Sequence, residues 1–234
     1  MYKKHIKRII DIVVSLTIVI LLIPAYLIVG ALIKLIDKDK MIFTQTRTGL
    51  NGKEFKILKF RTMKNGKVTK LGQVLRNTSI DEIPQFINVL KGDMSLVGPR
   101  PWVPGYYENF NERQKTRVNV RPGLVGLAQV NGRKGINIFK KIEFDLYYVE
   151  NLNLVLDLKI ILKSLKVIVA KENPECVNGY VQREIEDLKV SNGEIEWEMG
   201  TVPISQNPIF GISEPSPFPK KKMNGEIKKC KHIL

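Results

Sequence analysis

An uncharged apolar run from Ile12 to Ile33 constrains the fold of this chain more than any other feature of its sequence. As an α-helix the run would measure about 33 Å, which matches the hydrocarbon core of a bilayer. It is too long for the apolar core of a signal peptide, and no small-residue cleavage site follows it. The sequence therefore predicts an N-terminal segment that inserts into a membrane.

Two topologies fit this run. Basic residues flank both ends, namely Lys3, Lys4, Lys7 and Arg8 before it and Lys34, Lys38 and Lys40 after it. Because positive charge prefers the cytoplasmic side of a membrane, a straight span leaves one end on the unfavourable side. A re-entrant helix satisfies both ends, and Pro24 supplies the break because proline removes a backbone hydrogen bond. A single span kinked at the proline is the alternative.

Asp11 is the acidic residue nearest to the run. At the membrane interface it would pair with Lys7 or Arg8, and otherwise it would be a solvated surface carboxylate.

The charge balance points to anionic partners. The net charge is +15 and the isoelectric point about 9.7, which suits nucleic acid, an anionic bilayer face or phosphorylated substrates. The two cysteines, Cys176 and Cys230, form no metal-binding pattern, and the two histidines, His5 and His232, stand at opposite ends of the chain. A disulfide framework, a zinc site and a Ser-His triad are therefore not expected.

Turn and periodicity signals predict a mostly helical α+β fold after the apolar run. Two β-prone segments, Met41–Thr48 and Glu54–Met63, flank Asn51-Gly52, which is a strong hairpin signal. Two helices follow, the second of which should end at Gly92. A short amphipathic helix is expected near Glu108–Val118.

The C-terminal part divides into helices and an extension. A helical pattern is broken around Asn151–Asn153, and Leu156–Lys171 is apolar with spaced lysines, so this helix lies on a membrane or packs on a core. Most of Ser191–Leu234 is rich in Pro, Ser and Lys and is expected to be poorly ordered, with a basic run that touches anionic lipid or is simply solvated. We expect a membrane segment at 1–36, a compact catalytic domain at 37–171 and a largely tail-like extension at 172–234.

The adjacent carboxylates Asp81 and Glu82 are the most suggestive chemical feature. Ser79 and Glu82 have capping-box spacing, so the pair can be read simply as a helix start with acids at its positive end. Many cations surround the pair in the sequence: Lys59, Arg61, Arg76, Arg100, Arg121 and Arg133. Among such cations a carboxylate is expected to have a lowered pKa and to stay ionised.

Such a set of residues suits phosphate chemistry. Arginine grips phosphate oxygens in bidentate fashion, although each arginine taken singly is more typical of a surface charge or a salt bridge. Prolines and glycines in Gly98–Pro101 and Arg121–Gly126 are expected to hold these cations on stiff, close turns. With a divalent metal, one carboxylate can attack phosphorus while the other orients the metal.

Taken together, these motifs resemble the bacterial sugar transferases, and more narrowly the small monotopic phosphoglycosyl transferases. The resemblance extends from about Lys4 to Ala170 and rests on five ordered segments: KRIIDIVVS (Lys7–Ser15), QTRTGLNGKEFKILKFRTM (Gln45–Met63), LRNTSIDEIPQFINVLKGDMSLVGPRP (Leu75–Pro101), RPGLVGLAQVNGR (Arg121–Arg133) and FDLYYVENLNLVLDLKIILKSL (Phe144–Leu165). Several long motifs in order are far more specific than one short pattern. Two positions depart from the family: Ile23 and Asn153 stand where it often has serine.

The resemblance implies transfer of a sugar-1-phosphate from a UDP-sugar to polyprenol phosphate, with release of UMP, as the first lipid-linked step of glycan assembly. It implies that Asp81 is the nucleophile, that Glu82 assists through Mg²⁺, that Lys59, Arg76 and Arg100 contact phosphate, and that Asp157 lies near the site. It further implies a re-entrant membrane helix, interfacial amphipathic helices and a catalytic domain on the cytoplasmic face of the bacterial inner membrane. It specifies neither the sugar nor the oligomeric state.

A binding protein is the alternative from a different class. A membrane-anchored scaffold whose basic domain grips nucleic acid or anionic lipid would explain the net charge. It would not explain an acidic pair among arginines held by glycine and proline, and the aromatic interleaving typical of single-strand binders is scarce. Nucleic acid is therefore not an expected partner.

Overall fold

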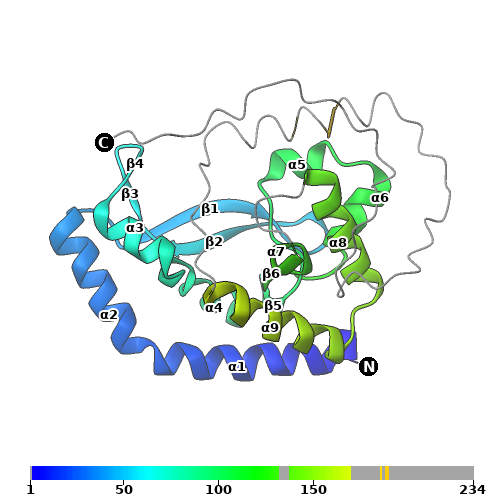
Figure 1. The fold of residues 1–234 in the computed structure, drawn as a ribbon, viewed down its shortest axis with the longest axis horizontal. Helices are drawn as coiled ribbons and strands as arrows, with labels where there is room; N and C mark the ends of the chain where they lie inside the picture. Colours follow the sequence, from blue (N-terminus) through cyan, green and yellow to red (C-terminus); the bar gives the residue numbers. More distant parts are fainter. Residues whose placement is uncertain (1, 132–136, 170–184, 186–187, 190–234) are drawn as a thin grey trace. The chain divides into compact units, whose positions relative to one another are not determined.

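The computed structural model describes residues 2–131, 137–169, 185, 188 and 189, all within the compact unit Met1–Trp197. Arg133 and nearly all of the expected extension at 172–234 lie outside the described residues. The fold is mostly helical, with three small two-stranded sheets among the described residues, which confirms the α+β expectation (Figure 1).

The apolar run forms two helices joined at an angle. A short π-helical turn, η1 (Tyr2–Ile6), leads into α1 (Lys7–Leu21), which is followed by α2 (Ile23–Leu32) and η2 (Ile33–Asp37). Of the helices that the structure describes, none is long and apolar enough to cross a bilayer alone, whereas α1 and the α2–η2 segment meet this test as a pair bent by 57° (Figure 1).

The bend lies at Leu22, two residues before the expected break at Pro24. Leu22 has φ −94° and ψ 6°, and Pro24 occupies the first turn of α2, where proline is well tolerated. Because the proline ring clashes with the carbonyl four residues earlier, the distortion falls on the preceding turn. Proline therefore starts the second helix, and the chain bends just ahead of it.

The side of α1 that faces the rest of the protein is polar. Asp11 is 3% exposed and accepts hydrogen bonds from the Ser95 hydroxyl (3.1 Å) and the Leu96 backbone N–H (3.0 Å), so the interpretation of Asp11 as a solvated surface carboxylate is wrong. Arg8 donates to the carbonyls of Val89 and Leu90 at the end of the helix that precedes Gly92. These long-range bonds fix α1 against the rest of the fold.

The opposite side of α1 and much of α2 is apolar and exposed. Exposed fractions reach 60% at Ile9, 57% at Val13, 70% at Leu21 and 68% at Leu27. On α1 the arrangement, with polar groups inside and apolar groups outside, reverses the usual pattern of a helix on a water-soluble protein.

The expected hairpin is present. Strands β1 (Ile42–Thr48) and β2 (Glu54–Phe60) pair antiparallel, with Phe43 opposite Lys59, and Asn51 and Gly52 adopt positive φ values of 54° and 78° in the connecting turn η3 (Leu50–Gly52). Positive φ at both positions matches the twist of a tight hairpin, which explains the Asn-Gly pair. A second, minimal hairpin joins β3 (Met63–Lys64) and β4 (Lys67–Val68).

The middle of the chain supplies the elements around the acidic pair. They are α3 (Lys70–Asn77), the 3-10 turn η4 (Ile80–Glu82), α4 (Gln85–Lys91), β5 (Ser95–Val97) and β6 (Gly123–Val125). Helix α4 ends at Gly92 with φ 93°, as expected. Strands β5 and β6 are parallel, and a Cβ on Gly123 would lie 2.1 Å from the Gly98 nitrogen, so only glycine permits this backbone approach.

The remaining described helices follow, and two of them supply buried side chains to a separate core cluster around Tyr106 and Ile142. The remaining helices are α5 (Pro104–Glu108), α6 (Glu112–Lys115), η5 (Thr116–Val118), α7 (Leu127–Asn131), α8 (Ile138–Glu150) and α9 (Leu154–Val169). The single helix expected near Glu108–Val118 is instead divided, because Asn111 caps a new helix through a capping box with Gln114. Leu188 is fully buried beside Tyr106, so the core extends beyond residue 171.

Candidate active site

The acidic pair lies on a short strained turn between α3 and α4. Ser79 adopts the left-handed conformation, with φ 58° and ψ 14°, and its side chain makes no capping hydrogen bond, so the capping-box interpretation is wrong. The spacing suggested a cap, but a left-handed Ser79 cannot act as the extended residue that such a cap requires. Non-glycine residues in this conformation are uncommon and often occur at functional sites.

Two long-range contacts fix the position of this turn. Asn88 of α4 accepts a hydrogen bond from the Leu58 backbone N–H (2.9 Å) and donates to the Lys56 carbonyl (2.9 Å), which holds α4 against the edge of β2. Tyr26 of α2 donates from its hydroxyl to the Ile83 carbonyl at 2.8 Å. The acidic turn therefore lies between the hairpin and the apolar helix pair.

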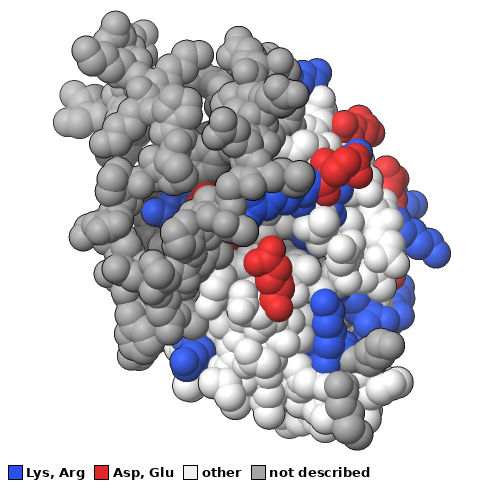
Figure 2. Space-filling view, turned by 90° about the vertical axis from the view of Figure 1, so that its right-hand side faces the viewer, with Lys and Arg blue, Asp and Glu red and all other residues white. Residues whose placement is uncertain are grey.

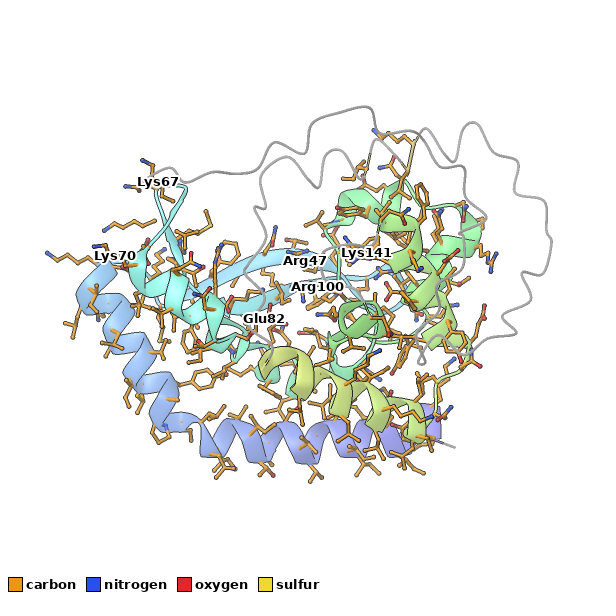
Figure 3. All side chains as sticks on the ribbon, viewed as in Figure 1. Arg47, Lys67, Lys70, Glu82, Arg100 and Lys141 are labelled. Atoms are coloured by element: carbon orange, nitrogen blue, oxygen red, sulfur yellow. The ribbon has the colours of Figure 1, made fainter. Side chains whose placement is uncertain are left out.

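Glu82 is the anion at the centre of the cation cluster. Its Oε1 accepts a hydrogen bond from Lys59 Nζ at 2.6 Å and another from Arg100 Nη2 at 3.3 Å. Burial opposes its ionisation, but the charges of Arg100 and Lys59 outweigh that effect and lower the pKa of Glu82 to about 2. Figure 3 shows Glu82 and Arg100 close to one another. Glu82 is ionised, as expected.

Asp81 has a different environment. It is 8% exposed, and its carboxylate has no hydrogen-bond partner within the part of the chain described. Desolvation raises the pKa of Asp81, the nearby Lys59 lowers it less, and the charge of Glu82 raises it further. The expected lowering of the pKa is therefore wrong for Asp81, because Glu82 already engages the cations. The result is a desolvated carboxylate with free oxygen lone pairs beside a firmly ionised one.

The other predicted cations separate into two groups. Arg76 donates from Nε to the Thr62 hydroxyl (2.9 Å) and still acts on the pKa of Asp81, so it belongs with Lys59 and Arg100. Arg61 instead pairs with Asp39 at 3.5 Å, and Arg121 donates to the Gly92 carbonyl at 2.9 Å beside Arg8. Arg61 and Arg121 are engaged in these separate contacts.

Asp157 joins the N-terminus to α9. It is 4% exposed and accepts hydrogen bonds from the hydroxyls of Tyr2 (2.5 Å) and Tyr148 (2.7 Å) and from Lys7 Nζ (2.6 Å). These donors come from η1, α1 and α8, so in this structure Asp157 holds elements together.

Arg47 is a candidate that the sequence analysis missed. It donates to the Pro101 carbonyl (3.3 Å) and to Gln45 Oε1 (2.6 Å), and its buried Nε has no partner within the described residues. Burial and the neighbouring Arg100 lower the pKa of Arg47 to about 10. Figure 3 places Arg47 close to Arg100. Only a tertiary contact reveals this residue, because Arg47 is remote from the acidic pair in the sequence.

A second missed residue, Arg117, supports the loop that carries Arg100. Its Nη2 donates to the Arg100 carbonyl at 2.8 Å and to Asp145 Oδ2 at 2.6 Å, and its guanidinium lies 4.2 Å from the centre of the Trp102 ring. Both members of the Arg117–Asp145 pair are 2% exposed. Arg117 therefore fixes the backbone from which the Arg100 side chain reaches Glu82.

Asp81 and Glu82 are the two carboxylates that would hold a Mg²⁺ ion together with the phosphates of a substrate. Among the described residues, no group of three or more acidic, histidine or cysteine side chains is placed to hold a metal. Mg²⁺ is often held by only one or two carboxylates together with substrate phosphates, however, and Asp81 and Glu82 supply two. A cation there would also offset the desolvation that raises the pKa of Asp81.

The chain is similar to known bacterial proteins over most of this fold. It is 38% identical to an uncharacterized sugar transferase of Bacillus subtilis, EpsL, over 74% of this chain and 91% of that protein. It is 42% identical to a UDP-glucose:undecaprenyl-phosphate glucose-1-phosphate transferase of Klebsiella pneumoniae, over 66% of this chain and 38% of that longer protein. It is 35% identical to the exopolysaccharide production protein ExoY of Sinorhizobium fredii, over 69% of this chain and 84% of that protein.

A family model described as bacterial sugar transferase matches residues 2–171, the region that contains the apolar helix pair, the hairpin, the acidic turn and α9. The expected resemblance is thereby confirmed, and the chain belongs to the bacterial sugar transferase family, as a phosphoglycosyl transferase.

Proposed function

We propose that this enzyme transfers a sugar-1-phosphate from a UDP-sugar to polyprenol phosphate, releases UMP and so begins the assembly of a lipid-linked glycan. The observation that carries the proposal is the unpartnered carboxylate of Asp81 beside Glu82, which Lys59 and Arg100 hold ionised. The relatives named for UDP-glucose and undecaprenyl phosphate support the same substrate classes.

In the first step an Asp81 oxygen attacks the phosphorus that carries the sugar. The bond from this phosphorus to the bridging oxygen breaks, UMP leaves with the electron pair, and an aspartyl phosphosugar remains. Arg100, Arg76 and Lys59 reduce the repulsion between the carboxylate and the diphosphate, because guanidinium and ammonium groups pair with phosphate oxygens. Arg47 adds positive charge beside Arg100.

In the second step a phosphate oxygen of the polyprenol phosphate attacks the same phosphorus. The aspartyl bond breaks, the carboxylate of Asp81 is regenerated, and a polyprenol-diphosphate-linked sugar is formed. If the attacking phosphate carries a proton, Glu82 cannot readily take it with a pKa of about 2, so the proton passes to solvent. Mg²⁺ held by Asp81 and Glu82 would supply further neutralisation of the diphosphate charge.

The acceptor is a lipid, so the site must lie at a bilayer surface. The two arms of the bent pair, Lys7–Leu21 and Ile23–Asp37, are each about 22 Å long. With both ends level at the surface and a bend of 57°, the break would lie about 11 Å deep, roughly a third of the hydrocarbon core. We therefore favour a re-entrant dip over a span, with α9 presenting its exposed Val155, Leu158 and Leu162 to the interface.

This orientation places the acidic turn at the membrane. Tyr26, which lies on the helix after the break, donates a hydrogen bond to the carbonyl of Ile83, the residue next to Glu82. The basic residues at both ends of the helix pair would lie on the cytoplasmic side of the inner membrane. The alternative function, a membrane-anchored scaffold that binds nucleic acid or anionic lipid, accounts only for the positive net charge. Figure 2 shows acidic side chains interspersed with lysines and arginines among the described residues of one face.

UMP release tests the proposed function. Purified protein in detergent with Mg²⁺ and polyprenol phosphate is expected to release UMP from at least one member of a panel of UDP-sugars. Omission of the acceptor should limit UMP to about one equivalent per protein, because the covalent intermediate then cannot turn over. Release of UDP in place of UMP, or no release from the entire panel, would contradict the proposed reaction.

Accessibility of cysteines tests the topology. In a background with Cys176 and Cys230 replaced by serine, Lys3→Cys and Lys40→Cys should both react with an impermeant thiol reagent from the same side of sealed vesicles. The physical reason is that both ends of a re-entrant pair return to one interface. A span would instead give labelling from opposite sides, and the detergent-solubilised proteins serve as the control for full labelling.

A further inference from the structure

A pocket outside the acidic turn lies where α2 and η2 turn into β1. It has a volume of about 910 Å³ and is lined by Leu27, Gly30, Ala31, Lys34, Lys38, Asp39, Lys40 and Met41. None of these residues belongs to the set that surrounds Asp81 and Glu82. The pocket is therefore a separate site.

One wall of the pocket is apolar and continues onto the exposed surface of α2. Leu27, on this wall, is 68% exposed. Gly30 lies under Met41, since a Cβ at Gly30 would come within 2.1 Å of the Met41 sulfur. The floor of the pocket is thus formed by direct contact between the helix and the start of β1.

The other wall carries excess positive charge. The ammonium groups of Lys34, Lys38 and Lys40 have no acidic partner among the described residues, and all three side chains are exposed. Asp39, the single acid in the lining, accepts a hydrogen bond from the Lys40 backbone N–H at 2.6 Å and pairs with Arg61 at 3.5 Å. Its charge is therefore already compensated, and the three lysines are left to attract an anion.

We propose that this pocket binds the headgroup of an anionic phospholipid from the surrounding leaflet, with the phosphate at the lysines and the start of an acyl chain along Leu27 and Ala31. The proposal rests on the membrane placement of α2 under the proposed function. A ligand must be both anionic and apolar to fill the two walls, which a nucleotide or a free phosphate is not. A membrane phospholipid fits better than polyprenol phosphate as the occupant, because the acceptor must reach Asp81 and the pocket shares no lining residue with that site.

Native mass spectrometry of the detergent-solubilised protein provides the test, with phosphatidylglycerol and phosphatidylcholine as probes. The parent is expected to retain one phosphatidylglycerol at least about tenfold more strongly than one phosphatidylcholine. The triple variant Lys34→Gln, Lys38→Gln, Lys40→Gln should lose this preference. A matched variant with the same loss of charge elsewhere, Lys53→Gln, Lys56→Gln, Arg113→Gln, should keep it.

Three outcomes would overturn the proposal. Equal loss of the preference in both triple variants would mean that only the net charge matters. If the triple variant of Lys34, Lys38 and Lys40 kept the preference for phosphatidylglycerol, the lipid would bind somewhere other than this pocket. Displacement of phosphatidylglycerol by polyprenol phosphate, with a raised KM for the acceptor in the pocket variant, would make the acceptor the occupant. The UMP assay on the parent is independent of all three, so failure of the proposed function would be seen separately.

Discussion

Asp81→Asn is expected to lower UMP release by a factor on the order of 10³ or more, because an amide in place of the carboxylate removes the nucleophile. The replacement has nearly the same shape, and Asp81 makes no side-chain hydrogen bond within the described residues. Desolvation already raises the pKa of this carboxyl group, so removal of its charge should leave the thermal stability unchanged or slightly higher. Loss of activity without loss of stability is what distinguishes a nucleophile from a structural acid.

Covalent trapping gives a second readout of the same variant. Protein that is quenched after mixing with its preferred UDP-sugar, without acceptor, should carry a phosphosugar on the peptide that contains Asp81. The adduct should be absent in Asp81→Asn and present in Glu150→Gln, a control that neutralises an exposed acid on α8. Normal turnover by Asp81→Asn, or an adduct on another residue, would contradict the assigned role.

Glu82→Gln should behave differently from Asp81→Asn. This variant removes the anion that Lys59 and Arg100 share, so two cations lose their partner at the site. A covalent adduct on Asp81 can still form in it, although slowly, because the nucleophile is intact. The roles of the two carboxylates can therefore be distinguished by the covalent adduct, which is expected to form in Glu82→Gln and to be absent in Asp81→Asn.

Turns and helix ends could be predicted from the sequence where one short segment determines the local backbone conformation. Asn51-Gly52 specifies its turn because both residues tolerate positive φ, and Gly92 ends α4 for the same reason. The break between α8 and α9 likewise follows from polar residues between two apolar patterns. In each of these cases the residues that make the structure are neighbours in the chain.

The errors concern residues whose environment is built by distant segments. Asp11 was expected to pair with Lys7 or Arg8 at the interface or to be a solvated carboxylate, but Ser95 and the Leu96 N–H satisfy it in a buried position. Ser79 has the spacing of a cap, yet it adopts the left-handed conformation and makes no side-chain capping bond. The pKa of Asp81 depends on which neighbour Lys59 and Arg100 bind, and spacing in the sequence cannot rank Asp81 against Glu82.

Asp145→Asn is expected to lower the free energy of unfolding by about 3 kcal/mol or more, because it leaves the guanidinium of Arg117 buried without its counter-charge. Arginine cannot readily lose its proton, so the cost is not relieved by a change of protonation state. Pulse proteolysis in detergent measures the effect, with Glu150→Gln on the same helix as the control. The reciprocal Arg117→Met should cost less, because the buried Asp145 carboxyl, whose pKa burial already raises, can become neutral.

The double variant Arg117→Met, Asp145→Leu separates the contribution of the ion pair to stability from the contribution of Arg117 to the position of Arg100. Since a buried ion pair is often no more stabilising than apolar residues of similar volume, the double variant should recover much of the stability lost in Asp145→Asn. It should not recover activity, because the hydrogen bond from Arg117 to the Arg100 carbonyl is still missing and the Arg100 side chain is then poorly positioned at Glu82. A stable double variant with a raised KM for the UDP-sugar is the expected result. Full activity in it would mean that Arg117 serves the core of the fold alone.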